Sequence, residues 1–215
     1  VMEALELTFD FIEGEPARDI IRFQKMWEGG PTYNAQLEDH VPPIEVEFAE
    51  NEKNVRFKMI QTGHGFGSTE DNCAEFCRKE AYLNIDGEEK FSRYIWRECG
   101  DVPLYPQGGN WVSDRTNWCP GASVYPDNYE LTEFITPGET HTINYDMEYY
   151  DQPWDGSRPW WKLASYLITY GEPNRRNDAE LTEIIAPSEA KIHNRYNPRN
   201  IHPVVKITNK GGDAL

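Results

Sequence analysis

Apolar and polar residues alternate along several stretches of the chain, with the two-residue period of a β-strand. The alternation is clearest over residues 5–11, 55–59 and 143–149. Further strand candidates are shorter apolar stretches bounded by turn residues, namely residues 20–27, 44–48, 80–85, 90–97, 130–136 and 163–170. A helical period of 3.6 residues is nowhere sustained. The pattern therefore predicts a protein built of β-strands.

Turn-forming residues separate the predicted strands. Gly, Pro, Asn and Asp cluster at residues 13–16, 85–87, 136–138 and 171–174, and these residue types favour a change of chain direction. Many short strands joined by such turns are typical of an antiparallel sandwich or jelly roll. We accordingly expect an all-β fold.

Composition and charge indicate which classes of binding partner this protein does not favour. Aromatic residues make up 13% of the 215 residues, so a sizeable core is possible although hydrophobic residues reach only 38%. Acidic residues outnumber basic ones by 37 to 21, a net charge of −16, which argues against nucleic acid or an anionic membrane as a partner. No apolar run approaches the ~20 residues of a membrane-spanning helix. The chain starts at Val1 without a signal peptide, so we expect a cut inside a longer protein.

The four cysteines fall within one segment of the chain, at Cys73, Cys77, Cys99 and Cys119. An even, clustered number favours two disulfides and an oxidising compartment. Three pairings are possible, and the short separation of the first two cysteines favours Cys73–Cys77 with Cys99–Cys119. A zinc site is the alternative, although zinc-binding pairs usually have the shorter Cys-x-x-Cys spacing.

Two irregular segments, residues 62–72 and 98–121, interrupt the strand pattern and hold the candidate chemistry. Long irregular loops in compact domains are usually functional. Glu75 stands between two cysteines, so a disulfide there would fix the direction of its carboxylate, as an acid, a base or an acceptor for a polar ligand. A surface glutamate on a stapled turn is the structural alternative. His64 lies between two glycines, which permit a close approach of backbone or ligand.

The second segment combines aromatic and charged side chains before Cys119. Its Trp faces could stack on a sugar ring while Arg and Asp bind the hydroxyl groups. A small Trp-rich core that supports an irregular loop is the alternative. The residues concerned are Trp111, Asp114, Arg115 and Trp118.

These motifs together resemble a known family. Cys-Ala-Glu-Phe-Cys at residues 73–77, the lone Cys99, and Gly-Asn-Trp-Val-Ser-Asp-Arg-Thr-Asn-Trp-Cys-Pro-Gly at residues 109–121 are similar to the C-terminal domain of the peptide-N-glycosidase F family. The resemblance extends from about residue 5 to about residue 188, and it is most specific over residues 63–121.

The resemblance implies a fold, a reaction and a cysteine pairing. The fold would be an eight-stranded antiparallel jelly-roll sandwich, shared in architecture with the peptidylglycine monooxygenases and packed in the family against a second jelly roll. The reaction would be hydrolysis of the amide that joins asparagine to the innermost GlcNAc of an N-glycan, without a metal or other cofactor. The substrate partner would be a glycopeptide, the cysteines would pair as favoured above, and the location would be secreted, periplasmic or cell-surface.

Matching positions imply roles for individual residues. Glu75 corresponds to the family's cleft glutamate, and Arg115, Trp118 and Trp111 to its neighbours in the cleft, with Asp114 beside them. Phe76 keeps an aromatic wall where the family has Trp. His64 also stands where the family has a Trp, between two glycines. We therefore predict Glu75 as catalytic and the six others as substrate-binding residues.

One part of the family's machinery is not found in this sequence. Its principal catalytic aspartate belongs to an N-terminal jelly roll, and we expect residues 1–187 of this chain to form the second jelly roll. We expect residues 188–215 to be a linker or the start of a further, truncated domain, and a C-terminal arm that docks on the sandwich is the alternative. The full-length protein would be the enzyme, and this part alone would be inactive. The alternative function is a non-catalytic glycan-binding module. A copper monooxygenase is disfavoured because the five histidines are scattered.

Overall fold

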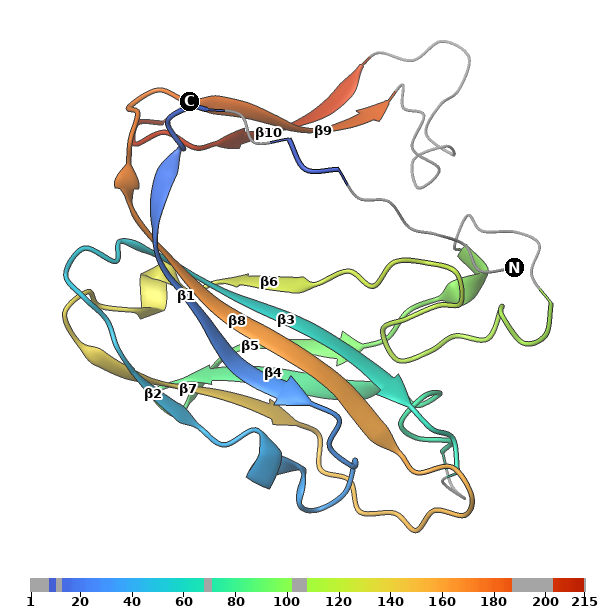
Figure 1. Cartoon of the computed structure of the whole chain (residues 1–215). Coiled ribbons are helices and arrows are strands. Elements are labelled where there is room, and N and C mark those ends of the chain that lie inside the picture. The colour runs from blue at the N-terminus through green and yellow to red at the C-terminus, as the bar shows by residue number, and fades with distance from the viewer. Residues whose placement is uncertain (1–7, 11–12, 68–70, 102–107, 187–202, 215) are drawn as a thin grey trace.

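Two four-stranded antiparallel sheets face each other in the computed structural model, which describes residues 8–10, 13–67, 71–101, 108–186 and 203–214 (Figure 1). One sheet has the order β1 (Arg18–Gly29), β8 (Trp160–Pro173), β3 (Asn54–His64) and β6 (Asp127–Glu130). The other has the order β2 (Ile44–Glu47), β7 (Thr140–Met147), β4 (Lys79–Ile85) and β5 (Glu88–Ile95). Short 3₁₀ helices cover Leu37–His40, Cys99–Asp101 and Thr132–Phe134.

The core lies between the two sheets because alternate residues of each inner strand point inward. In β3 and β8 every second side chain is buried along most of the strand. Aromatic rings supply much of the buried surface, as the 13% aromatic content predicted. Phe57 of β3, Tyr145 of β7 and Trp161 of β8 are each 1% exposed or less.

The predicted fold class is confirmed, and most of the predicted strands are present. Residues 130–136 were wrongly predicted as a strand: β6 ends at Glu130, and a 3₁₀ turn follows at Thr132–Phe134. The Thr132 hydroxyl accepts the Val55 amide hydrogen, at 2.9 Å, and so directs the turn. Leu131 and Ile135 are buried on this turn, which satisfies the apolar positions without a strand. The strand expected at residues 5–11 falls largely outside the described residues.

A two-stranded hairpin, β9 (Ala179–Ala186) with β10 (Val204–Asn209), follows β8 and projects from one end of the sandwich (Figure 1). The strand-like run near residue 204 is therefore a strand, whereas β9 was not predicted. The domain boundary at residue 187 stays a prediction. No helix in the described part of the chain is long and apolar enough to cross a membrane.

The ladder between β3 and β8 is continuous, without a shift in register. At one end Asn54 pairs with Tyr170, and at the other His64 pairs with Trp160. Ten residue steps of about 3.3 Å separate these ends, or roughly 33 Å. The candidate site lies at the His64 end.

Candidate functional site

A disulfide-closed turn presents Glu75 at the His64 end of the sandwich. Cys73 and Cys77 are bonded, with their Cα atoms 4.9 Å apart. The Glu75 amide donates to the Gly65 carbonyl at 2.8 Å, and the Glu75 carbonyl accepts the Thr116 amide hydrogen at 2.9 Å. The turn is therefore anchored both to the end of β3 and to the irregular segment that precedes Cys119.

Glycines allow this close packing of backbones. A Cβ atom on Gly63 would lie 2.0 Å from the Ala74 carbonyl oxygen. A Cβ atom on Gly65 would lie 2.0 Å from the Arg158 carbonyl oxygen, and Gly65 has a positive φ of +80°. A larger residue at position 63 would push the turn away, and one at position 65 would displace the backbone at Arg158. The glycines that flank His64 thus serve the close approach of backbone that the sequence indicated.

Arg115 is buried beneath the turn and forms an ion pair with Glu75. Its Nε lies 3.2 Å from Glu75 Oε1, and the side chains of Arg115 and Glu75 are only 3% and 14% exposed. Nη1 donates to the Ser113 carbonyl at 2.6 Å and lies 3.5 Å from the Trp111 carbonyl. Nη2 donates to the backbone and side-chain oxygens of Asn110, at 3.2 and 3.0 Å. All three guanidinium nitrogens thus have acceptors within the chain.

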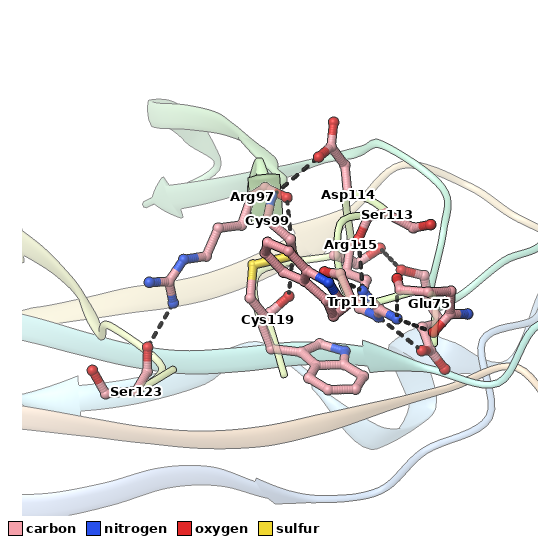
Figure 2. The surroundings of a disulfide bond; sticks show 12 residues. Glu75, Arg97, Cys99, Trp111, Ser113, Asp114, Arg115, Cys119 and Ser123 are labelled. Carbon is pink, nitrogen blue, oxygen red and sulfur yellow. Dashed lines mark hydrogen bonds and ion pairs between the residues drawn. A yellow bond between two sulfur atoms is a disulfide. The ribbon is translucent and has the colours of Figure 1, made fainter. Parts of the chain in front are cut away.

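The loop that Arg115 organises leaves one Glu75 oxygen open. Figure 2 shows the Arg115 guanidinium directed at Glu75, with the carbonyl groups of the loop around it. Glu75 Oε1 takes the Arg115 Nε–H, and Oε2 accepts no hydrogen bond from the described residues. A carboxylate held in one direction with one free oxygen can accept a hydrogen bond from a ligand or a water molecule.

Aromatic rings enclose the ion pair. The Arg115 guanidinium carbon lies 5.0 Å from the Phe76 ring centroid and 5.2 Å from that of Trp118. Phe66, which is 55% exposed, contacts Phe76 edge-on at 5.9 Å. The structure therefore brings together Glu75, Arg115, Phe76 and Trp118 beside an exposed apolar side chain.

His64 belongs to an adjoining aromatic stack. Its ring lies 4.6 Å from Trp160 and 5.4 Å from Trp118, centroid to centroid. The Trp118 indole donates to the Gly63 carbonyl at 2.9 Å. Burial lowers the pKa of His64. Trp160 is the member of this stack that was not predicted for the site.

The second disulfide, Cys99–Cys119, fixes the loop on the side away from Glu75. Asp114 Oδ1 accepts the Cys99 amide hydrogen at 3.1 Å, and Asp114 points away from Glu75 (Figure 2). Arg97 pairs with Arg115 through two backbone hydrogen bonds and donates to the Ser123 carbonyl. Asp114 is thus not brought together with Glu75, and its role in substrate binding stays a prediction, as does that of Trp111.

Both favoured disulfides are present, which disagrees with the zinc alternative. Among the described residues one group, Asp71, Cys73 and Cys77, has potential ligand atoms close together, but its two sulfur atoms are bonded to each other. A residue that sequence reasoning missed is Thr116, fully buried, whose hydroxyl lies 2.8 Å from the Cys77 carbonyl oxygen. It sits beside Arg115 in the sequence, but nothing in the pattern indicated its burial.

Two cavities lie away from Glu75. One, of about 260 Å³, is lined by aromatic and acidic residues that include Tyr33, Glu38, Asp146 and Tyr149. Burial, the charge of Asp146 and a hydrogen bond with Asp146 raise the pKa of Glu38 to about 7. The other, of about 320 Å³, lies at the Asn54 end of the β3–β8 ladder.

Comparison with solved structures identifies proteins with a similar fold. A crystal structure titled peptide-N(4)-(N-acetyl-beta-D-glucosaminyl) asparagine amidase gives a TM-score of 0.58 at 21% identity, over 69% of this chain and 51% of that one. PNGase F from Flavobacterium meningosepticum, described as a glycosylasparaginase, also gives 0.58, at 19% identity over 70% of this chain and 51% of that one. PNGF-II gives 0.54 at 22% identity, over 73% of this chain and 31% of that one. At these identities the likeness establishes the fold.

Sequence comparison assigns the family. The peptide-N(4)-(N-acetyl-beta-D-glucosaminyl)asparagine amidase F of Elizabethkingia miricola is 22% identical over 129 residues, which are 57% of this chain and 36% of that protein. The chain thus spans about half or less of the length of the relatives it matches. The family described as "Peptide-N-glycosidase F, C terminal" matches residues 32–168, more than half of the chain. The chain therefore belongs to the peptide-N-glycosidase F C-terminal domain family.

Proposed function

We propose that this chain is the C-terminal half of an amidase that hydrolyses the bond between asparagine and the innermost GlcNAc of an N-glycan. The observation that carries the proposal is the Glu75–Arg115 pair, fixed at the end of the sandwich by a disulfide and by loop carbonyls. Family membership supplies the reaction class, because the matched relatives are named as such amidases.

Glu75 is proposed to touch the substrate. Its Oε1 is engaged by Arg115 and its Oε2 remains available, so it can accept a hydrogen bond from a sugar hydroxyl or from a bound water. A carboxylate that is held rigidly loses little conformational entropy when it binds a ligand, which favours its use at a reacting centre.

Arg115 is proposed to act through Glu75 rather than on the substrate. Its guanidinium is saturated by four chain oxygens and the Glu75 carboxylate, and it is 2% exposed. Using it to bind a glycan would first require breaking bonds inside the loop. We therefore assign Arg115 as a positioning residue, and Phe76, Trp118 and His64 as the wall beside it.

The rest of the catalytic machinery is proposed to come from the N-terminal jelly roll. Amide hydrolysis needs a base that activates water and a group that stabilises the developing oxyanion. Glu75 supplies one carboxylate, and the principal aspartate of the family would complete the site across the interface with the N-terminal half. Phe66 and Trp154, which are 55% and 46% exposed, would lie near that interface.

The test is an assay of the full-length protein on a denatured N-glycoprotein, with released glycan as the readout. Glu75→Gln should lower kcat by roughly 10²-fold or more, because it removes a positioned carboxylate. Arg115→Lys should lower kcat while retaining part of the activity, since one donor can still reach Glu75. Glu89→Gln, an exposed glutamate on β5, is the matched control and should leave the rate unchanged. Unchanged activity for Glu75→Gln, or no release by the full-length protein, would contradict the proposal.

The alternative function is a glycan-binding module without turnover, and the same assay distinguishes it from an amidase. It predicts that chitobiose binds to the full-length protein with no glycan released. The proposed location is secreted, periplasmic or cell-surface. Two disulfides support an oxidising compartment outside the cytoplasm.

A further inference from the structure

A cavity with basic walls lies at the end of the sandwich opposite Glu75. It forms where the base of the β9–β10 hairpin meets the start of β1 and β3, and its volume is about 320 Å³. We call it the basic pocket. Its lining is Ala17, Arg18, Asn54, Arg56, Glu130, Tyr170, Thr208, Asn209 and Lys210. The volume lies at the lower end of the range for small-molecule sites.

The charge of the basic pocket is opposite to that of the protein. Three cations, Arg18, Arg56 and Lys210, line it together with one carboxylate, Glu130. The chain as a whole has a net charge of −16. Three basic side chains from three separate segments are therefore concentrated at one cavity in a strongly acidic protein. Such a local excess of positive charge attracts anions.

The three cations are only partly neutralised by the chain. Arg18 donates one bond, from Nη1 to the Gly171 carbonyl at 2.9 Å, and forms no ion pair with any described residue. Arg56 Nη2 lies 3.5 Å from Glu130 Oε2, and its guanidinium carbon lies 5.9 Å from the Tyr170 ring centroid. Lys210 Nζ lies 3.3 Å from Glu180 Oε2. Donor capacity is thus left over mainly on the two arginines.

The two side-chain amides of the basic pocket already donate hydrogen bonds within the chain. The Asn54 amide donates to Glu130 Oε1 and to Thr132 Oγ1, at 3.0 and 2.9 Å. The Asn209 amide donates to the Asp213 carbonyl at 2.8 Å. Recognition of a ligand would consequently depend on the guanidinium groups.

We propose that the basic pocket binds the anionic group of a small ligand, a carboxylate or sulfate, held between Arg18 and Arg56. A guanidinium presents two parallel N–H donors, which match the oxygens of either group. Tyr170 supplies a ring at the wall against which the body of a sugar-sized ligand can pack. The site is roughly 33 Å from the Glu75 end of the β3–β8 ladder, so it is independent of the proposed amidase function.

The test is calorimetry of the 215-residue chain with sodium sulfate and with glucuronate, and with glucose as the uncharged control. We expect saturable binding of at least one anion and none of glucose. Tighter binding of glucuronate would assign the pocket to a carboxylate on a sugar, and tighter binding of sulfate would assign it to the inorganic anion. No saturation by either anion up to about 10 mM, where a site of millimolar Kd is mostly filled, would overturn the proposal.

Variants connect the binding to the basic pocket. Arg18→Gln should weaken anion binding tenfold or more, and Arg56→Gln provides a second test if Arg18→Gln does not fold. Lys206→Gln removes the same charge from an exposed position on β10 outside the lining, and should change the affinity less than twofold. An equal loss in Lys206→Gln would show that net charge, and not the pocket, governs the binding, and would also overturn the proposal.

Discussion

Two arginines at opposite ends of one strand ladder differ in how completely the chain satisfies them. Arg115, near the His64 end of β3, is buried, and every guanidinium nitrogen has an acceptor within the chain. Arg18, near the Asn54 end, makes one side-chain hydrogen bond with the residues that the structure describes, and it lines a cavity. The same residue type therefore organises a loop in one region and is available to bind a ligand in the other.

This difference illustrates two roles of an arginine in a functional site, namely fixing neighbouring groups and binding a ligand. A saturated guanidinium fixes its neighbours, and here it fixes the direction of the Glu75 carboxylate. An unsaturated guanidinium retains donors for a ligand. The following experiments test the contrast, from the largest expected effect to the smallest.

Replacing the buried arginine should give the largest loss of stability. Arg115→Met should lower the free energy of unfolding by about 3–5 kcal/mol, because it leaves a largely buried carboxylate and several loop carbonyls without a partner. Urea unfolding followed by tryptophan fluorescence measures the change. Arg97→Met, which removes an exposed bond to the Ser123 carbonyl, is the control. A loss below about 1 kcal/mol would mean that Arg115 does not hold the loop together.

Opening the second disulfide should give the next largest effect. Replacing both Cys99 and Cys119 by alanine removes a link across 20 residues, and a loop of that size contributes about 3 kcal/mol to stability. The measurement is a thermal or urea transition of the oxidised wild type and the variant. If the two transitions coincide, the loop is held by Arg115 and its hydrogen bonds alone.

A pH series isolates other charged groups from this comparison, because neither arginine loses its proton in the accessible pH range. The pKa of Glu38 is raised to about 7, first by burial and then by Asp146. The folded state therefore binds more protons than the unfolded state between pH ~4.5 and ~7, and stability falls as pH rises through that window. Because Glu38 is partly exposed to solvent, we expect about 1 kcal/mol or less.

Glu38→Gln should flatten this fall in stability, which urea unfolding at pH 5 and pH 7.5 would measure. Glu45→Gln, an exposed glutamate on β2, is the matched control and should keep the wild-type dependence. A slope that is unchanged in Glu38→Gln would place the pH sensitivity elsewhere in the molecule.

The unsaturated arginine should matter least for stability. Arg18→Gln removes one hydrogen bond to the Gly171 carbonyl and no ion pair among the described residues, so the free energy of unfolding should change by less than about 1 kcal/mol. Chemical denaturation of the two proteins in the same buffer gives the difference. A loss comparable to that of Arg115→Met would remove the distinction between the two regions.

The strand pattern was predictable where the chain follows a single period. Residues 55–59 and 143–149 alternate because one face of each strand is buried. The first segment lies within β3, and most of the second lies in β7. Residues 130–136 were wrongly predicted as a strand because a 3₁₀ turn can bury Leu131 and Ile135 as well as a strand can. The Thr132 hydroxyl bond to Val55, across the sheet, selected the turn.

The candidate site was partly predictable for a similar reason. Glu75, Arg115 and Trp118 could be found because their neighbours, the cysteines and glycines, are fixed in sequence by covalent and steric requirements. The relation between them could not be found in this way. Their side chains meet only because the Thr116 and Gly65 backbones both bond to the turn around Glu75.

The sequence by itself determined that this protein is a β-sandwich with two disulfides, because periodicity and cysteine spacing are local properties of the chain. The tertiary structure decided which cationic side chains are satisfied by hydrogen bonds within the chain and which keep donors for a ligand. Apart from Glu75, the hydrogen-bond partners of the Arg115 side chain lie in its own loop, whereas Arg18, Arg56 and Lys210 come from three separate segments. Only the packing of the hairpin against the sheet brings those three cations to one cavity.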